Sequence, residues 1–221
     1  MCNLYTLAPG LDALAADFEK LGIKLRLTSP QAFDNQPLKP YVAPKGLGIF
    51  ARPIDPAAPA EGLEPVVGTW GVIPFFHKGP AKAWKSATNN ARSEDMLTKP
   101  TWRGIVKTNR CIIPADAFTE WTGPKGAKTK HAITRADGQR LFFAGLWADH
   151  TWEGERTESY TMVMQAAGGD DDMAPFHDRQ PVVLDRDSAR LWLDLSADPL
   201  AAIRPPLPGT LAFDPPEPAA A

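Results

Sequence analysis

The sequence predicts a single α+β domain, built on a mostly antiparallel, β-barrel-like sheet with a few short flanking helices. The chain has 221 residues, of which 43% are hydrophobic and 23% charged, which is the balance of one globular domain with a substantial core. Short segments rich in β-branched and aromatic residues recur along it with turn residues between them, as in an antiparallel sheet or barrel. Helical periodicity is confined to two short segments.

These two helices are expected near the two ends of the chain. In the first, apolar residues recur at helical spacing, and Gly22 follows where a left-handed cap would end the helix. The second helix is expected to begin near Asp187 and to continue through Leu191, Trp192 and Leu195. The apolar residues of the first helix are Leu11, Leu14, Ala15, Phe18 and Leu21.

Seven strands are expected between the helices, each short and bounded by turn residues. Gly123-Pro124 marks a turn in the middle of the chain, and Asp137-Gly138 predicts a hairpin. The expected strands are Gly48–Arg52, Pro65–Ile73, Arg110–Pro114, Phe118–Trp121, His131–Thr134, Leu141–Trp147 and Ser159–Gln165.

One domain is expected over residues 1–204, followed over residues 205–221 by a Pro/Ala-rich tail that is either an irregular strap or a disordered end. No segment has the roughly 20 apolar residues of a membrane span, and the N terminus lacks a signal-peptide pattern. We therefore expect a cytoplasmic protein, and nothing in the sequence requires more than a monomer. Cys2 and Cys111 are too few for a disulfide framework, and without zinc-like Cys/His spacing we expect neither a metal nor a cofactor.

Charge is unevenly distributed along the chain. The formal net charge of −2 argues against a protein that coats nucleic acid through bulk electrostatics. Between Lys78 and Arg110, however, eight basic residues stand against two acidic ones, whereas between Asp149 and Asp198 twelve acidic residues stand against four arginines. The first region could face phosphates while the second repels them. The alternative is that these charges are scattered over solvated surfaces.

Cys2 is chemically distinctive because it directly follows the initiator methionine. Removal of Met1 leaves a residue with both a free α-amine and a thiol. Such an amine, with an ordinary pKa of about 7.7–8.0, is a nucleophile near neutral pH, and the thiol can close the resulting imine into a five-membered ring. The position therefore suits capture of an aldehyde. A small residue without a chemical role is the alternative.

The segment from Asn89 to Glu94 combines a side-chain amide with a guanidinium, because Asn90 and Arg92 stand two residues apart. Asn can bond to a sugar hydroxyl, and Arg can hold a phosphate through parallel donors. These residues could read a sugar and its phosphate together. The alternative is a turn in which Asn caps a helix that begins around Arg92.

Glu120 and His177 are candidates for proton transfer. Glu120 lies in an otherwise apolar, strand-like stretch, where burial would raise the pKa of its carboxyl towards neutrality. A position on the solvent face of an edge strand is the alternative. His177 lies in a proline-bounded loop that leads into a strand, and imidazole is the side chain best suited to move protons near pH 7. A loop histidine bonded only to the backbone is the alternative.

Taken together, these motifs resemble those of one family, the SRAP domain proteins, which process abasic sites in bacteria and in eukaryotic nuclei. The family pattern is Cys at position two, then Trp-Gly-x-Ile-Pro, Asn-Ala-Arg-x-Glu, Arg-Cys-x-x-Pro-x-x-x-Phe-x-Glu-Trp, Ala-Gly-Leu-Trp and His-Asp-Arg-x-Pro. This sequence has the motifs in the same order over residues 2–195, as Cys2, Trp70–Pro74, Asn90–Glu94, Arg110–Trp121, Ala144–Trp147 and His177–Pro181.

The resemblance implies a protein of the DNA damage response with a positively charged groove for single-stranded DNA. Cys2 would crosslink covalently to the aldehyde of an abasic site as a thiazolidine, and Asn90 would hold the opened sugar. Glu120 and His177 would handle protons while the sugar ring opens and the adduct closes. The resemblance also implies a weak strand-cleaving lyase activity and self-removal of the residue before the cysteine, hence the description of such proteins as peptidases. When bound to DNA, the protein would associate with the nucleoid.

DNA contacts are expected around this site. By resemblance, Arg92 would hold the adjacent phosphate. Family members commonly have Arg at the fourth position, whereas this chain has Leu4, so phosphate contacts there are expected to differ. The other candidate DNA-binding residues are Trp70 and Pro44 together with four assigned from charge alone, namely Lys45, Lys85, Arg103 and Arg110.

Two other classes of function remain open from the sequence. A cysteine peptidase could use Cys2, His177 and Glu120, and it predicts peptide turnover without DNA. A non-covalent reader of damaged single-stranded DNA predicts binding that survives loss of Cys2. The position of Cys2 separates these classes from aldehyde capture, because only aldehyde capture uses a free α-amine.

Overall fold

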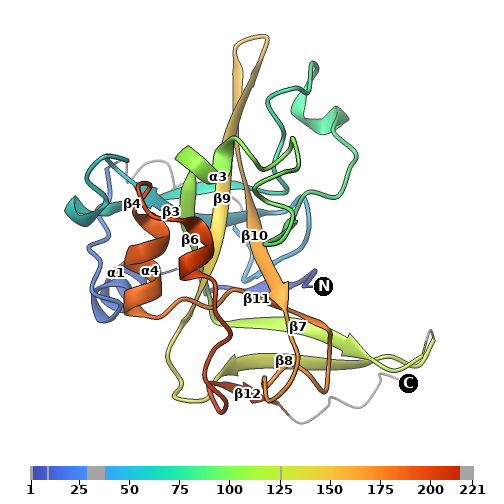
Figure 1. Cartoon of the computed structure of the whole chain (residues 1–221). Coiled ribbons are helices and arrows are strands. Elements are labelled where there is room, and N and C mark those ends of the chain that lie inside the picture. Colours follow the sequence, from blue (N-terminus) through green and yellow to red (C-terminus); the bar gives the residue numbers. More distant parts are fainter. Residues whose placement is uncertain (1, 9, 29–37, 125, 215–221) are drawn as a thin grey trace.

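The computed structural model describes residues 2–8, 10–28, 38–124 and 126–214, which form two β-sheets with short helices around them (Figure 1). The α-helices are α1 (Leu11–Lys20), α3 (Ile105–Thr108) and α4 (Arg186–Leu193). Three 3₁₀ turns connect other segments, namely η1 (Pro59–Glu61), η2 (Ala81–Ala83) and η3 (Pro199–Ala202).

The larger sheet contains a closed ring of strands. Its strand order is β11-β10-β4-β3-β6-β9, and β9 also pairs with β10, so β10, β4, β3, β6 and β9 close into a barrel. A short strand, β5 (Asn90–Arg92), runs parallel to β10 outside this ring. The other strands are β3 (Leu47–Pro53), β4 (Leu63–Trp70), β6 (Arg110–Ala115), β9 (Leu141–Trp152), β10 (Glu155–Ala166) and β11 (Arg179–Pro181).

The second sheet is antiparallel and joins the early part of the chain to its late part. Its order is β12-β8-β7-β1-β2. Asp116 alone separates β6 from β7, so the chain passes there directly from the barrel into the second sheet. The strands are β1 (Tyr5–Thr6), β2 (Tyr41–Val42), β7 (Ala117–Thr122), β8 (Thr129–Arg135) and β12 (Leu211–Phe213).

Buried aromatic side chains connect the two sheets. Tyr5 of the second sheet and Tyr160 of the barrel share a hydrogen bond between their hydroxyl groups, and both side chains are fully buried. The Tyr5 ring also packs edge-on against Trp70 at 5.1 Å between centroids. Removing each such side chain from water contributes about 1.5–3 kcal/mol, so this contact fixes the start of the chain against the barrel.

The predicted α+β class with a barrel-like sheet is confirmed, and all seven expected strands are present. The predicted strand Pro65–Ile73 ends early, at Trp70, because Gly71 takes a φ of 143° and turns the chain away. The hairpin predicted at Asp137-Gly138 is wrong, because β8 and β9 belong to different sheets. The long hairpin instead joins β9 and β10 through Glu153 and Gly154, both with positive φ.

The segment after Arg204 contains ordered structure that the sequence did not predict. Leu211–Phe213 form β12, which pairs with β8, although an irregular strap or disordered end was expected there. Residues 215–221 of the predicted tail lie outside the described residues. Within the described ranges, no helix is long and apolar enough to cross a membrane, and no group of three or more metal-ligating side chains is present.

Candidate active site around Cys2

Cys2 is held in place by the strand that follows it. β1 lies between β2 and β7, and this pairing fixes the N-terminal segment within the second sheet. The carbonyl oxygen of Leu4 accepts the main-chain N–H of Thr119 at 2.9 Å, and the Sγ of Cys2 donates to the same oxygen at 3.4 Å. The Cys2 side chain is fully buried.

Asn90 reaches Cys2 from the barrel. It begins β5, opposite Met162 of β10, and its Nδ2 donates a 2.7 Å hydrogen bond to the carbonyl oxygen of Cys2. Among the described residues, the buried Oδ1 of the same amide has no hydrogen-bond partner. A buried amide oxygen usually has a donor, so Asn90 presents an acceptor to whatever enters beside Cys2.

The main chain before Asn90 is anchored by a buried indole. The carbonyl oxygen of Asn89 accepts hydrogen bonds from the Nε1–H of Trp70 at 2.8 Å and from the N–H of Met162 at 2.9 Å. The Nδ2 of Asn89 also donates to the Oδ1 of Asn3 at 3.3 Å. This segment and the N-terminal residues therefore contact one another through both Asn89 and Asn90.

Glu120 lies on β7, which has β8 on one side and β1 on the other. Its side chain is 3% exposed, so the alternative of a solvent-facing residue on an edge strand is wrong. Burial raises the pKa of the Glu120 carboxyl, while electrostatic interactions with His177 and Lys128 partly oppose the rise. Glu120 therefore has the raised pKa of a general acid or base, because desolvation disfavours its carboxylate.

The Cys2 thiol is protonated at neutral pH in this environment. Burial first, and the nearby charge of Glu120 second, raise the pKa of Cys2 to about 12. Glu120 raises the pKa of Cys2 and His177 lowers the pKa of Glu120, so each pair interacts electrostatically. Glu120 follows Thr119, whose N–H donates to the Leu4 carbonyl oxygen that Cys2 also contacts. The structure therefore brings Asn90 and Glu120 to the Cys2 segment, and His177 interacts with this group through Glu120.

His177 lies in the loop before β11, and its side chain is 25% exposed. Its Nδ1 accepts the main-chain N–H of Arg179 at 2.9 Å, and the Oδ1 of Asp178 lies 2.8 Å from the same nitrogen. The first contact requires a bare Nδ1 and the second a protonated one. We favour the bare Nδ1, because Asp178 is 87% exposed and its carboxylate can be solvated.

An ion pair joins the His177 loop to the strand of Asn90. The Nη1 of Arg179 donates to both carboxylate oxygens of Glu94 at 2.8 Å. Glu94 follows β5, and Arg179 begins β11. β5 and β11 also both pair with β10. The ion pair and β10 together hold the His177 loop and the strand of Asn90 next to each other.

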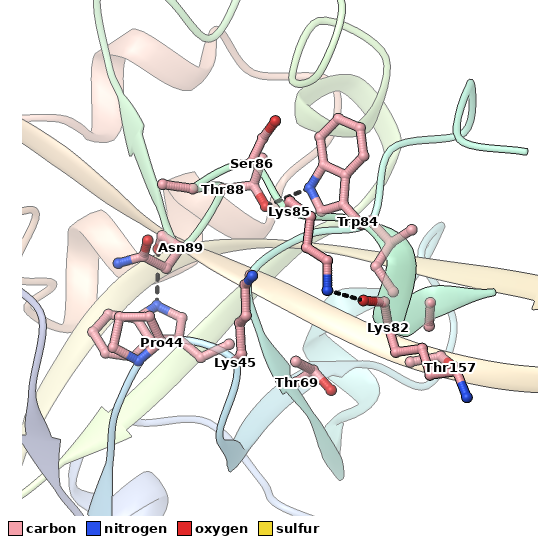
Figure 2. A pocket seen from close by; sticks show the side chains of 15 residues that line it. Pro44, Lys45, Thr69, Lys82, Trp84, Lys85, Ser86, Thr88, Asn89 and Thr157 are labelled. Carbon is pink, nitrogen blue, oxygen red and sulfur yellow. Dashed lines mark hydrogen bonds between the residues drawn. The ribbon is translucent and has the colours of Figure 1, made fainter. Parts of the chain in front are cut away.

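A basic pocket of about 290 Å³ opens beside Asn89 (Figure 2). Lys45, Lys82 and Lys85 lie on its wall together with Pro44. Lys45 has a left-handed backbone with φ of 68°, which is uncommon outside glycine, and hydrogen bonds between this turn and Trp70 hold it there. Three lysines therefore contribute to the wall of a pocket that Asn89 also lines, and the Nζ of Lys85 donates to the carbonyl oxygen of Lys82 at 3.1 Å (Figure 2).

A family model described as SOS response associated peptidase (SRAP) matches residues 1–213. The chain belongs to the SRAP family. Similar curated members are named abasic site processing proteins: YoaM of Bacillus subtilis is 35% identical over 130 residues, which is 57% of this chain and 54% of YoaM. YedK of Escherichia coli is 32% identical over 59% of this chain and 54% of its own, and HMCES of Xenopus tropicalis is 33% identical over 59% and 45%. The matched region thus spans about half the length of these relatives.

Solved structures also resemble this SRAP chain. A protein from Bordetella bronchiseptica aligns with a TM-score of 0.78 and 27% identity over 96% of this chain and 98% of its own. A protein from Bacteroides thetaiotaomicron aligns with a TM-score of 0.76 and 19% identity over 96% and 90%, which supports the fold alone.

Not every DNA-binding candidate in this SRAP chain is placed to contact DNA. Arg110 is 3% exposed, and its guanidinium donates to the carbonyl oxygens of Val106, Trp192, Asp194 and Ala197, so its assignment from charge was wrong. These bonds join α3 to the end of α4 and the loop after it, which is a structural role.

The remaining candidates differ in exposure. The Trp70 indole is fully buried against Tyr5, so it supports Asn89 and offers no surface for a nucleobase. Arg92 and Arg103 are exposed but do not line the basic pocket. The helix that was the alternative around Arg92 is absent, because residues 90–92 form β5.

Sequence reasoning missed Asn89 and the Glu94–Arg179 pair. Glu94 and Arg179 lie inside two motifs that were recognised, and their opposite charges were the available signal. The two residues are 85 positions apart in the chain, so only the fold shows that they meet.

Proposed function

We propose that this protein processes abasic sites in DNA by capturing the sugar aldehyde covalently on Cys2, with single-stranded DNA as the substrate. The observation that carries the proposal is the convergence of Asn90 and Glu120 on Cys2, the residue that becomes N-terminal once Met1 is removed. Membership of the SRAP family and the names of its abasic-site-processing relatives support the same substrate.

The raised pKa of the Cys2 thiol indicates that the α-amine attacks the aldehyde before the thiol does. With its pKa raised to about 12, the Cys2 thiol is almost entirely protonated at pH 7. The α-amine, whose ordinary pKa is about 7.7–8.0, supplies far more reactive nucleophile at that pH. The amine therefore attacks the aldehyde first, and the thiol reacts second.

The chemistry balances without a cofactor. The amine nitrogen adds to the aldehyde carbon, and the carbinolamine loses water to give an imine. The S–H of Cys2 then adds across the C=N bond, so that sulfur joins the carbon and the thiol proton ends on nitrogen. The product is a thiazolidine whose mass equals protein plus DNA less one water.

Each side chain near Cys2 has a role in these reaction steps. Glu120, with its raised pKa, accepts and returns the protons of the carbinolamine and the thiol. His177 assists opening of the closed sugar, which otherwise hides the aldehyde. Asn90 holds the Cys2 carbonyl with its donor and accepts a sugar hydroxyl with its Oδ1.

The basic pocket and Arg92 hold the flanking backbone. Lys45, Lys82 and Lys85 surround a space next to Asn89, and phosphates are attracted to such clusters. If the imine persists before ring closure, loss of the β-phosphate cleaves the strand, so weak lyase activity accompanies capture.

A peptidase active on other proteins is a weaker candidate, although the family description contains that word. A peptidase cysteine needs a thiolate, which an adjacent cation stabilises. Around Cys2, burial and the Glu120 charge favour the neutral thiol instead. Removal of Met1 remains the one peptide cleavage that the proposal requires.

Mixing the protein with single-stranded DNA that carries one abasic site tests the proposal. A denaturing gel and intact mass should show an adduct of protein lacking Met1 plus DNA less one water. Cys2→Ala should abolish the adduct, whereas Cys111→Ala, which removes the other buried thiol, should keep it.

A chain with one alanine inserted between Met1 and Cys2 separates the amine from the thiol. It retains Cys2 but lacks an α-amine on that residue, so it should form no adduct. Absence of adduct with the parent protein, once Met1 is shown to be removed, would overturn the proposal. DNA binding that survives in Cys2→Ala without any parent adduct would identify a non-covalent reader.

A further inference from the structure

We propose that the C-terminal strand β12 is a positioning element for His177, acting through Phe213 and Asp172. The inference rests on the proposed function, in which His177 moves protons. It assigns a role in the active site to a segment expected from the sequence to be an irregular or disordered tail.

Asp172 connects the loop of His177 to the segment at β12. Its Oδ1 accepts the main-chain N–H of Gly209, and its Oδ2 accepts that of Leu211, both at 2.8 Å. Hydrogen bonds to a carboxylate are about twice as strong as neutral ones, and two on one side chain fix its orientation. The acidic end of the loop is thereby bound to the start of β12.

Phe176 makes the second connection, one residue before His177. Its ring stacks on that of Phe213 at 4.1 Å between centroids, with 10° between the ring planes. The His131 ring packs edge-on against Phe176 at 5.1 Å. Phe176 thus contacts both β12 and β8, and its neighbour His177 is confined by these contacts.

β12 is held by its pairing with β8, the strand that also pairs with β7 next to Glu120. Phe213 pairs with Ile133 of β8, and the N–H of Asp214 donates to the carbonyl oxygen of Ala132 at 3.0 Å. On the other side of β8, His131 stands opposite Glu120 in β7. β12 therefore contacts Phe176, the neighbour of His177, and pairs with β8, the strand that lies next to Glu120.

A loop residue needs such support to act as an acid or base. The chain from Ala167 to Asp178 contains turns but no helix or strand. Strand hydrogen bonds therefore fix the position of Glu120 but not that of His177. Displacing a catalytic group by about 1 Å can cost up to about 10²-fold in rate. Loss of the Phe213 ring should therefore slow the chemistry without changing DNA affinity.

Phe213→Ala tests the inference, with Phe213→Tyr as the variant that keeps the ring. Leu207→Ala is the matched control, because Leu207 lies in the same segment and is 79% exposed. Thermal unfolding first establishes that each variant is folded. The adduct rate is then measured at saturating abasic DNA across pH 5–9, and affinity is measured with DNA that carries a non-reactive tetrahydrofuran analogue.

Phe213→Ala should slow adduct formation by about tenfold, with altered pH dependence and unchanged affinity for the analogue. Phe213→Tyr and Leu207→Ala should match the parent. An unchanged rate and pH profile in folded Phe213→Ala would overturn the inference, and so would a loss of rate explained entirely by a smaller folded fraction.

A second readout needs no reaction, so it separates this inference from the proposed function. The ¹⁵N signals of histidine-labelled protein, assigned with His177→Gln, report which ring nitrogen of His177 carries the proton. The parent should show Nδ1 as a hydrogen-bonded acceptor, and Phe213→Ala should lose this state. If the parent forms no adduct, the proposed function fails while this spectrum still decides whether β12 positions His177.

Discussion

The Nδ2 of Asn90 donates a 2.7 Å hydrogen bond to the carbonyl oxygen of Cys2. The two residues come from different sheets, one from a strand beside the barrel and the other from the segment before β1. Asn90 therefore holds Cys2 through its main-chain carbonyl, and this hydrogen bond involves neither the main-chain nitrogen nor the thiol of Cys2.

Replacing this donor should slow adduct formation. Asn90→Asp keeps the size of the side chain but puts a carboxylate oxygen against the Cys2 carbonyl, so we expect a rate loss of about tenfold or more. Asn109→Asp, the same change in the loop before β6, is the control and should leave the rate unchanged. Single-turnover kinetics at saturating abasic DNA measure both, and equal rates would contradict the assigned contact.

Glu120→Gln should stabilise the protein at neutral pH while reducing its activity. Burial raises the pKa of Glu120 above its ordinary value of 4.5, so its stabilising contribution is present below pH 4.5 and is lost as pH rises through the folded-state pKa. The loss amounts to about 1.4 kcal/mol for each pH unit of that window. Thermal unfolding from pH 4 to 8 should show a melting-point gain in the variant that grows with pH. A difference independent of pH would contradict this.

Lys45→Gly should separate stability from DNA binding. Glycine adopts the φ of 68° without the steric penalty of about 1–2 kcal/mol that other residues incur, so the variant should melt no lower than the parent. Losing the ammonium from the basic pocket should weaken binding and reduce the salt dependence by about one phosphate contact. Fluorescence anisotropy over a salt series measures this. A lower melting point with unchanged binding would reverse the interpretation.

Arg92 and Arg110 should respond differently to alanine. Arg92 is exposed, so Arg92→Ala should weaken DNA binding and its salt dependence while stability stays within about 0.5 kcal/mol. Arg110→Ala leaves four carbonyl oxygens without their donor and should cost about 3 kcal/mol of unfolding free energy. Denaturant unfolding and anisotropy together distinguish them, and unchanged affinity of Arg92→Ala over the salt series would argue against a phosphate contact.

Seven strands and the candidate catalytic residues were named from the sequence because each has a local signal. The short strands β1, β2, β5, β11 and β12 are not among those seven. Glu120 stands out as a charge within an apolar strand, and His177 lies in a loop bounded by Pro175 and Pro181. Asn90 was recognised from its motif, but its place in a strand was not. β5 runs parallel to β10, and its partner residues lie 72 positions later in the chain. Turn residues could not show that Asp137-Gly138 connects two sheets.

Burial was the main property that the local pattern could not supply. Trp70 and Arg110 have the residue types of DNA contacts, yet both are enclosed by segments distant in the chain. In the same way, the composition after Arg204 suggested an irregular or disordered end. The order of this segment depends on long-range hydrogen bonds, which Gly209 and Leu211 donate to Asp172 and which composition does not show. Such contacts depend on the completed fold.

The strand order of the second sheet also has a consequence during protein synthesis. Cys2 leaves the ribosome first, but the β7 strand beside it comes more than 100 residues later, and His177 is 175 residues behind. At about 5–20 residues per second, translation takes roughly 10–35 s to deliver His177 after Cys2. During that interval the nascent chain carries Cys2 without Glu120 and His177, so under the proposed function the proton transfers assigned to these two residues become available only when the chain has folded.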